Sequence, residues 1–206
     1  MLPDEFGALV PSHWMMIDLT PATGRMARLL ASLSDDQLDR ATPMPGTTLG
    51  GLVDHVSGLT VGFTLVAHKS TGRTGPPPPP DASKLGDGWR ERIAQELDLL
   101  ADAWRQSAAW EGMTAAAGIE LPGEVAGLVA LDELVVHGWD VAVASGQPYD
   151  PTLEEVAAAT SFVSSFNAPR DGNLFGPIVA VADDASPLEK LLGLAGRDPS
   201  WTPSKA

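Results

Sequence analysis

The segment LDELVVHGWD, residues 131–140, decides how this chain of 206 residues folds. Apolar residues flank Glu133, His137 and Asp140, so the pattern predicts a helix that is buried almost all round. At about 100° per residue, Glu133 and His137 lie about 40° apart on one face. A carboxylate buried beside an imidazole is costly unless both groups have partners. Two explanations stay open here: a shared metal ion, or a hydrogen-bonded Glu–His pair without metal.

Four long helices are predicted from the apolar spacing, and their approximate ranges are 13–39, 47–69, 87–110 and 122–144. Pro21 allows the first to begin there instead, with Thr20 as its N-cap. Pro122 is placed in the first turn of the fourth helix, and Gly146 is its expected C-cap. Shorter helices are expected over 152–166 and 187–194.

The economical fold is therefore all-α: an antiparallel four-helix bundle with a long crossover between the second and third helices. The crossover contains the five prolines 76–80, which favour an extended polyproline II spacer over a recognition segment. We expect residues 1–168 to form the bundle, including the fifth helix at 152–166. Residues 169–206 are expected to form a tail packed on it, with an irregular course around one short helix.

Composition excludes several classes of function. A net charge of −14 argues against nucleic acid and against an anionic membrane surface, because both require clustered Lys and Arg. The chain has no uninterrupted apolar run of about 18 residues and no secretory signal at its start, so we expect a soluble cytoplasmic protein without a membrane partner. With no cysteine present, a metal ion would have to be bound by His, carboxylate or water.

His55 lies in the middle of the apolar stripe of the second predicted helix, so its ring is expected to point into the bundle. A lone core histidine is more often structural than a ligand, but two inward histidines and a glutamate on facing helices can converge on one ion. We therefore predict a divalent metal site at His55, Glu133 and His137. Such a donor set suits zinc first, then nickel, cobalt or iron.

The remaining candidates are weaker. His68 is about 140° around the helix from His55 and is expected to be exposed, and His13 is expected on the surface. Asp140 could be a fourth ligand, a partner that orients a histidine, or a simple helix-terminal charge; the orienting role is favoured. Asp54 is expected to be solvated.

Several stretches resemble the mycothiol-dependent maleylpyruvate isomerase family, which belongs to the wider DinB-like helical bundles. They are DELVVHGWDVA (132–142) with SGQP (145–148), LVDHVSG (52–58) after PMPG (43–46), and the tail pieces FGP (175–177), PLEKLL (187–192) and GRDP (196–199). The resemblance implies a DinB-like bundle with zinc held by His55, Glu133 and His137. It also implies mycothiol as a thiol cosubstrate.

Two features depart from that family. Its members commonly carry a Trp and an Arg shortly before the first ligand, whereas residues 46–51 here read GTTLGG. The isomerase also has a separate C-terminal domain, for which the short tail is not an obvious equivalent. The isomerase reaction is therefore not carried over, and no catalytic acid or base is assigned.

Two main hypotheses follow. The first is a metal-dependent enzyme of the isomerase or thiol-S-transferase kind, in which the metal activates a small thiol. The second is a non-catalytic bundle that binds a metal or another small ligand, and a metal-free structural bundle stays open as a third. The chain could be a monomer or a homodimer.

Overall fold

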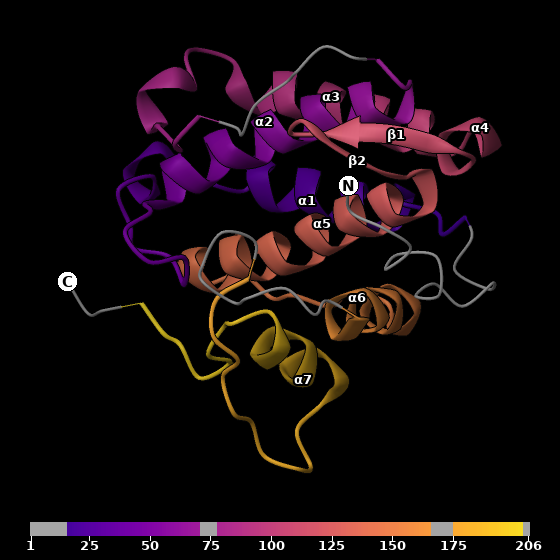
Figure 1. The fold of residues 1–206 in the computed structure, drawn as a ribbon. Helices are drawn as coiled ribbons and strands as arrows, with labels where there is room; N and C mark the ends of the chain where they lie inside the picture. Colours follow the sequence, from indigo (N-terminus) through magenta and orange to yellow (C-terminus); the bar gives the residue numbers. More distant parts are fainter. Residues whose placement is uncertain (1–15, 71–77, 166–174, 204–206) are drawn as a thin grey trace.

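The structure is a computed structural model, and it describes residues 16–70, 78–165 and 175–203 (Figure 1). The α-helices in this part are α1 (Thr20–Ala31), α2 (Leu49–Ala67), α3 (Trp89–Trp104), α4 (Ser107–Trp110), α5 (Gly123–Ser145), α6 (Leu153–Ser165) and α7 (Pro187–Leu194). The short elements are two 3₁₀ turns, η2 (Asp35–Gln37) and η3 (Ala82–Lys84), and two strands, β1 (Met113–Ala116) and β2 (Ile119–Pro122). The fold is mostly helical, as the sequence predicts.

Four helices form the bundle. α1 packs against α3 and α5, and α2 packs against the same two helices, so α1 and α2 lie diagonally across from each other. α6 covers the outer side of α5, and α7 packs on α6 (Figure 1). The central position of α5 explains why its sequence is apolar almost all round.

The ends of α5 agree with the prediction. Pro122 is its N-cap residue, and the helix ends at Gly146, whose φ of +77° is the left-handed conformation that favours glycine at this position. α2 begins after Thr48, whose side chain accepts a hydrogen bond from the backbone N–H of Gly51. α7 spans the predicted range 187–194.

The first and third predicted helices are too long. α1 ends at Ala31 rather than Asp39, because the η2 turn follows and the carbonyl of Leu33 accepts hydrogen bonds from Arg90 instead. Thr20 is not the N-cap: Leu19 takes that position, and the Asp18 carboxylate accepts from the Thr20 N–H.

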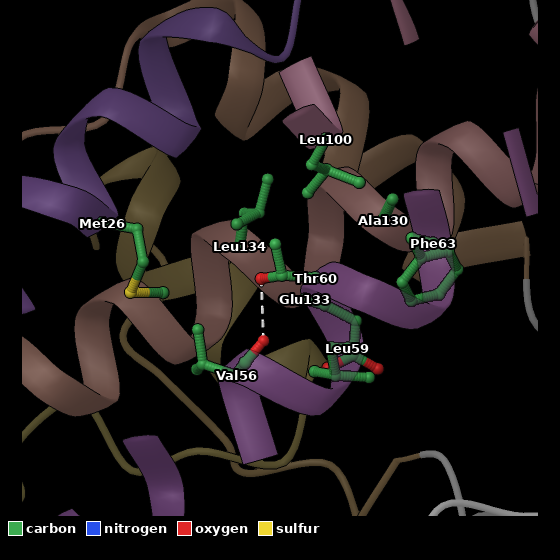
Figure 2. Close-up of a pocket in the computed structure, with 9 residues that line it drawn as sticks. All are labelled: Met26, Val56, Leu59, Thr60, Phe63, Leu100, Ala130, Glu133 and Leu134. Atoms are coloured by element: carbon green, nitrogen blue, oxygen red, sulfur yellow. Dashed lines mark hydrogen bonds between the residues drawn. The ribbon is translucent and has the colours of Figure 1, made fainter. Parts of the chain in front are cut away.

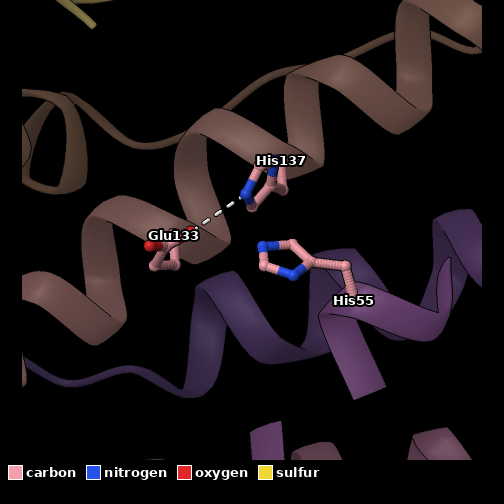
Figure 3. Close-up of side chains that lie close together, drawn as sticks. All are labelled: His55, Glu133 and His137. Carbon is pink, nitrogen blue, oxygen red and sulfur yellow. Dashed lines mark ion pairs between the residues drawn. The ribbon is translucent and has the colours of Figure 1, made fainter. Parts of the chain in front are cut away.

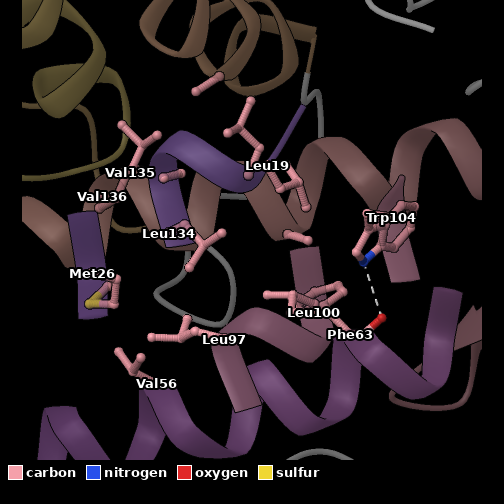
Figure 4. Packing of buried hydrophobic residues seen from close by; sticks show 14 of the residues in the cluster. Leu19, Met26, Val56, Phe63, Leu97, Leu100, Trp104, Leu134, Val135 and Val136 are labelled. Atoms are coloured by element: carbon pink, nitrogen blue, oxygen red, sulfur yellow. Dashed lines mark hydrogen bonds between the residues drawn. The ribbon is translucent and has the colours of Figure 1, made fainter. Parts of the chain in front are cut away.

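The third predicted helix divides into α3 and α4. Its chain folds back after Trp104, and the indole N–H of Trp110 donates to the Trp104 carbonyl at 2.7 Å. The indole of Trp104 in turn donates to the carbonyl of Phe63 (Figure 4). The Trp104 bond ties the end of α3 to α2. The Trp110 indole takes the Trp104 carbonyl, which in one continuous helix would accept from a backbone N–H four residues later.

A hairpin replaces the link expected before the fourth helix. β1 and β2 pair antiparallel, and Ala117 and Gly118 at its turn have φ values of +51° and +84°. Positive φ at both central residues is typical of a two-residue hairpin turn. The hydroxyl of Thr114 donates to the carbonyl of Val66 at 2.8 Å and anchors the hairpin on α2.

The core lies between the four bundle helices. Aliphatic side chains from α1, α2, α3 and α5 meet there, with Trp104 the largest that is fully buried (Figure 4). By length and composition alone, α2 could cross a membrane, since its mean hydropathy is 1.4, but 56% of that stretch is buried inside the protein. Burial of this kind is what the core helix of a bundle shows.

Two predictions fall partly outside the described residues. Of the five prolines, 76 and 77 lie outside them, and 78–80 form no helix or strand. The tail contacts the rest of the chain through α7 and through Arg197, while the boundary at residue 168 stays a prediction.

Candidate metal centre

The three predicted ligands come together. His55 projects from α2, and Glu133 and His137 project from the facing side of α5 (Figure 3). One ligand atom from each residue lies within 4.8 Å of the other two. Among the described residues, this is the one group of three or more His, Cys, Asp or Glu side chains arranged in this way.

Glu133 and His137 are in direct contact, with Oε2 of Glu133 at 2.9 Å from Nε2 of His137. The ring of His55 meets that of His137 edge-on, with centroids 5.0 Å apart and planes at 88°. Neither ring nitrogen of His55 has a hydrogen-bond partner among the described residues. The side chain of Glu133 is 25% exposed, so the cluster is open to solvent on one side.

A second contact fixes the other side of the His137 ring. Its Nδ1 lies 2.9 Å from Oδ2 of Asp140, a carboxylate that is fully buried. Asp140 thus occupies the orienting position that the sequence favoured for it. A metal-ligating histidine commonly donates its second ring N–H to such a carboxylate.

Arg197 completes the arrangement, and the search for ligands in the sequence missed it. Its Nε and Nη2 donate to the Asp140 carboxylate at 3.0 Å and 2.9 Å, across 57 positions of the chain. In the sequence, Arg197 was indicated only by the tail stretch 196–199, one of the pieces that resemble the family. The four side chains Glu133, His137, Asp140 and Arg197 form one continuous polar row.

Charge and burial set the protonation states in this row. Burial alone would lower the pKa of His137, but its hydrogen bonds to Asp140 and Glu133 raise it to about 9. Burial would raise the pKa values of Glu133 and Asp140, but the His137 contacts, and for Asp140 also the charge of Arg197, hold both below their usual values. Burial and the charge of His137 lower the pKa of His55, so its ring is neutral near pH 7.

Asp132 is a separate feature of the same helix. It is 4% exposed, and its Oδ1 has no hydrogen-bond partner among the described residues. Burial, and next the negative charge of Glu133, raise the pKa of Asp132 well above its usual value. This shift favours the protonated form of Asp132, and its carboxyl group is not part of the cluster formed by His55, Glu133 and His137.

A close backbone contact holds the ligand-bearing turn of α5 in place. The hydroxyl of Tyr149 donates to the carbonyl of Val135 at 2.8 Å. A Cβ at Gly138 would lie 2.6 Å from that hydroxyl oxygen, so only glycine permits the contact without displacing the ring. Gly138 thus allows Tyr149, in the chain beyond α5, to pack against the helix.

The other candidate residues lie elsewhere. His68 is the C-cap residue of α2 and is exposed, as predicted, and His13 lies outside the described residues. Asp54 was expected to be solvated, which is wrong: it is half-buried, and its Oδ2 accepts a hydrogen bond from the backbone N–H of Asp81 at 3.0 Å. Asp54 therefore holds the end of the crossover against α2.

The donor set fits a divalent ion. Two imidazole nitrogens and one carboxylate oxygen form a common three-residue set for zinc, which leaves a further position for water or substrate. His55 presents a neutral ring, Glu133 is ionised, and Asp140 is placed to keep a proton on Nδ1 of His137 so that Nε2 faces the cluster.

Fold and site together define a class: a DinB-like helical bundle with a His–Glu–His cluster shared by two of its helices. The family model described as "Mycothiol maleylpyruvate isomerase N-terminal domain" matches residues 19–142, more than half of the chain. The chain belongs to this family. The match includes all three candidate ligands and ends before Arg197.

Relatives agree with this assignment. Uncharacterized proteins from two strains of Mycobacterium tuberculosis are each 30% identical over 184 residues, covering 85% of this chain and 93% of theirs. The crystal structure of the mycothiol-dependent maleylpyruvate isomerase is similar with a TM-score of 0.58, at 16% identity, over 79% of this chain and 71% of that one. A histidine-to-alanine mutant of the isomerase is similar with a TM-score of 0.57, at 17% identity. At such identity the likeness establishes the fold alone.

Proposed function

We propose that the chain binds one divalent metal ion, zinc first, through His55, Glu133 and His137, and that it uses this ion to activate a small thiol. The thiol favoured by family membership is mycothiol. The reaction class is isomerisation or thiol transfer on an electrophilic carbon.

The observation that carries the proposal is His55. A structural Glu–His pair accounts for Glu133 and His137, which satisfy each other at 2.9 Å. It does not account for a neutral imidazole on the facing helix that is directed at this pair and has no hydrogen-bond partner within the described part of the chain (Figure 3). A third donor that converges on a paired carboxylate and imidazole is what a metal site requires.

A bound divalent ion would supply one kind of chemistry here, which is to lower the pKa of a thiol and hold it as the thiolate. The residues of the chain have separate tasks. Asp140 holds His137 in one tautomer and one orientation. The hydrogen bond to His137 and the charge of Arg197 together lower the pKa of Asp140 although this carboxylate is fully buried. The partly exposed Glu133 marks the side from which a small thiol reaches the cluster.

The test is elemental analysis of protein purified without added metal and without a histidine tag. We expect close to one zinc per chain, tight enough to survive gel filtration. Calorimetry then compares mycothiol binding to the zinc-loaded and chelator-treated protein, followed by turnover of an electrophilic test substrate. Protein that neither retains nor rebinds zinc would refute the proposal.

One observation favours a second candidate, a non-catalytic metal-binding bundle. The run 46–51 leading into α2 carries no charged side chain where the family commonly has an Arg. In that case zinc would raise the melting temperature, but mycothiol would neither bind to the zinc form nor shift its melting temperature further. The same calorimetric comparison therefore separates the two candidates.

A further inference from the structure

A groove lies beside the cluster, between α2 and the β1–β2 hairpin. Residues from both elements line it, and its volume is about 110 Å³. That is somewhat less than the roughly 150 Å³ of an engineered apolar cavity that binds benzene in another protein. The lining residues used below are Gly58, Leu59, Gly62, Phe63, Leu65 and Ala115–Ala117.

Two glycines inside a helix are among the residues that line the groove. Gly58 and Gly62 lie one turn apart on α2, and a Cβ built on either one would meet nothing within 4 Å. Glycine inside a helix is less stable than alanine, and no close packing requires it at these two positions. Their effect on the surface is to keep the groove open.

The groove continues the face of α2 that carries His55. Leu59 and Phe63, four and eight residues after His55, line the groove and also a small cavity against Glu133 (Figure 2). That cavity has a volume of about 10 Å³, and Leu59 and Phe63 therefore border both the groove and the side of the cluster at Glu133. Gly62 lies about 10 Å along the helix axis from His55, since the rise is about 1.5 Å per residue.

The lining is uncharged. Of the described residues that line the groove, none carries a charge, and the hydroxyl of Ser70 is the one polar side-chain group. A dicarboxylate would leave its charges without a partner there, in a protein that already has a net charge of −14. Apolar walls of this size favour an uncharged alkyl chain or a single ring.

We propose that this groove binds the apolar part of the electrophile whose reactive carbon meets the thiol at the cluster. The substrate class is thus an uncharged, short-chain or monocyclic electrophile rather than a small dicarboxylic acid. This inference rests on the proposed function for what happens at the metal. The presence of an apolar binding groove can be tested without it.

The first experiment uses metal-free protein with labelled methyl groups in an NMR titration. Benzyl alcohol is expected to shift the signals of Leu65 and Ala115–Ala117 saturably, and maleate is not. Gly62→Leu fills the groove and should abolish the shifts. The matched control is Gly24→Leu on α1, where a built Cβ meets only the end of the Arg28 side chain, at 3.5 Å; it should leave the shifts intact.

Three results of this titration would contradict the proposal that the groove binds an apolar ligand. They are no saturable shift, an equal shift in Gly62→Leu, and a dimer that Gly62→Leu disrupts. The dimer would mean that a second copy of the chain covers this face. Analytical ultracentrifugation of the same samples detects it.

The second experiment tests the connection to the metal. Zinc-loaded protein is titrated with straight-chain hydroxamates from acetohydroxamate to hexanohydroxamate. Affinity should rise roughly fourfold per added CH₂ until the groove is full, and Gly62→Leu should remove this rise. If acetohydroxamate binds but chain length has no effect, the groove inference fails and the metal proposal stands. If zinc does not bind but benzyl alcohol does, the proposed function fails and the groove remains.

Discussion

Replacing Arg197 tests whether the tail supports the candidate metal centre. Arg197 donates three hydrogen bonds to the Asp140 carboxylate, at 2.9 Å, 3.0 Å and 3.2 Å. Asp140 is fully buried and is the group that holds Nδ1 of His137. Among the described residues, Arg197 is the one cationic partner of this carboxylate besides the histidine, so Arg197→Leu is expected to weaken the orientation of His137.

Two magnitudes follow from the structure. Removing one partner of a buried ion pair leaves an uncompensated charge and costs about 3–5 kcal/mol of folding free energy. Loss of the group that supports a histidine ligand lowers metal affinity about 10–100-fold. Arg197→Leu is expected to show both effects. Arg197→Lys should recover only part of the affinity, because an ammonium group cannot form the same forked contact.

A matched control is available in the ion pair between Arg25 and Glu155. Its side chains are 12% and 2% exposed, against 14% and 0% for Arg197 and Asp140. Arg25→Leu should therefore cost a similar folding free energy without lowering zinc affinity. The assay is competition for zinc with a chromophoric chelator, at a temperature where circular dichroism shows both variants folded. Equal loss of zinc affinity in the two variants would refute a specific role for Arg197.

Three further predictions concern the cluster and its helices. His137→Ala should abolish tight zinc binding. It should lower the free energy of unfolding by about 1–3 kcal/mol through the lost metal-linked stability, and by about as much again because the Glu133 carboxylate loses its partner. A full equivalent of bound zinc in this variant would contradict the three-ligand site. His68→Ala is the exposed control and should change stability by no more than about 0.5 kcal/mol. In metal-free protein, the pKa of His137 is about 9 in the folded state, against the ordinary histidine value of 6.5. Because the folded-state pKa is the higher one, the protonated ring contributes up to about 3 kcal/mol to the free energy of unfolding below pH 6.5. This contribution is lost as the pH rises through 9. Urea denaturation at pH 6, 8 and 10 measures this loss, and a flat profile would contradict it. Gly138→Ala should lower the free energy of unfolding by about 1–3 kcal/mol, because the added Cβ meets Tyr149. Gly62→Ala should raise it by up to about 1 kcal/mol, because a Cβ there has no atom within 4 Å. A higher melting temperature for Gly138→Ala would count against the close contact with Tyr149.

The sequence predicted α5 and α2 well because their signals are local and strong. Pro122 and Gly146 mark the two ends of α5, and Thr48 marks the start of α2. The apolar pattern around His55 predicted that its ring points into the bundle, and the ring meets that of His137 on α5. These features depend on residues within one or two turns of each other, which is where pattern analysis is most reliable.

The features that were missed depend on contacts between distant parts of the chain. The break between α3 and α4 follows from the indoles of Trp104 and Trp110, which donate to carbonyls that helical periodicity does not reveal. Asp54 was misjudged because its partner is the backbone of residue 81, beyond the proline run. The hairpin was missed because its sequence shows little alternation of apolar and polar residues. β1 contains two alanines, and its buried residue, Thr114, is polar and bonds to α2.

The polar row also bears on what binds at the open side. In metal-free protein its charges cancel, because the His137 imidazolium and Arg197 balance the carboxylates of Glu133 and Asp140. On the proposed function, a bound dication would take the place of the one proton on Nε2 of His137, and the row would then carry one net positive charge. An anionic ligand bound to that ion would restore neutrality, so the proposal favours a thiolate over a neutral thiol or water. Arg197 holds Asp140 and contributes one of the positive charges, so on this proposal the tail would also favour an anionic ligand.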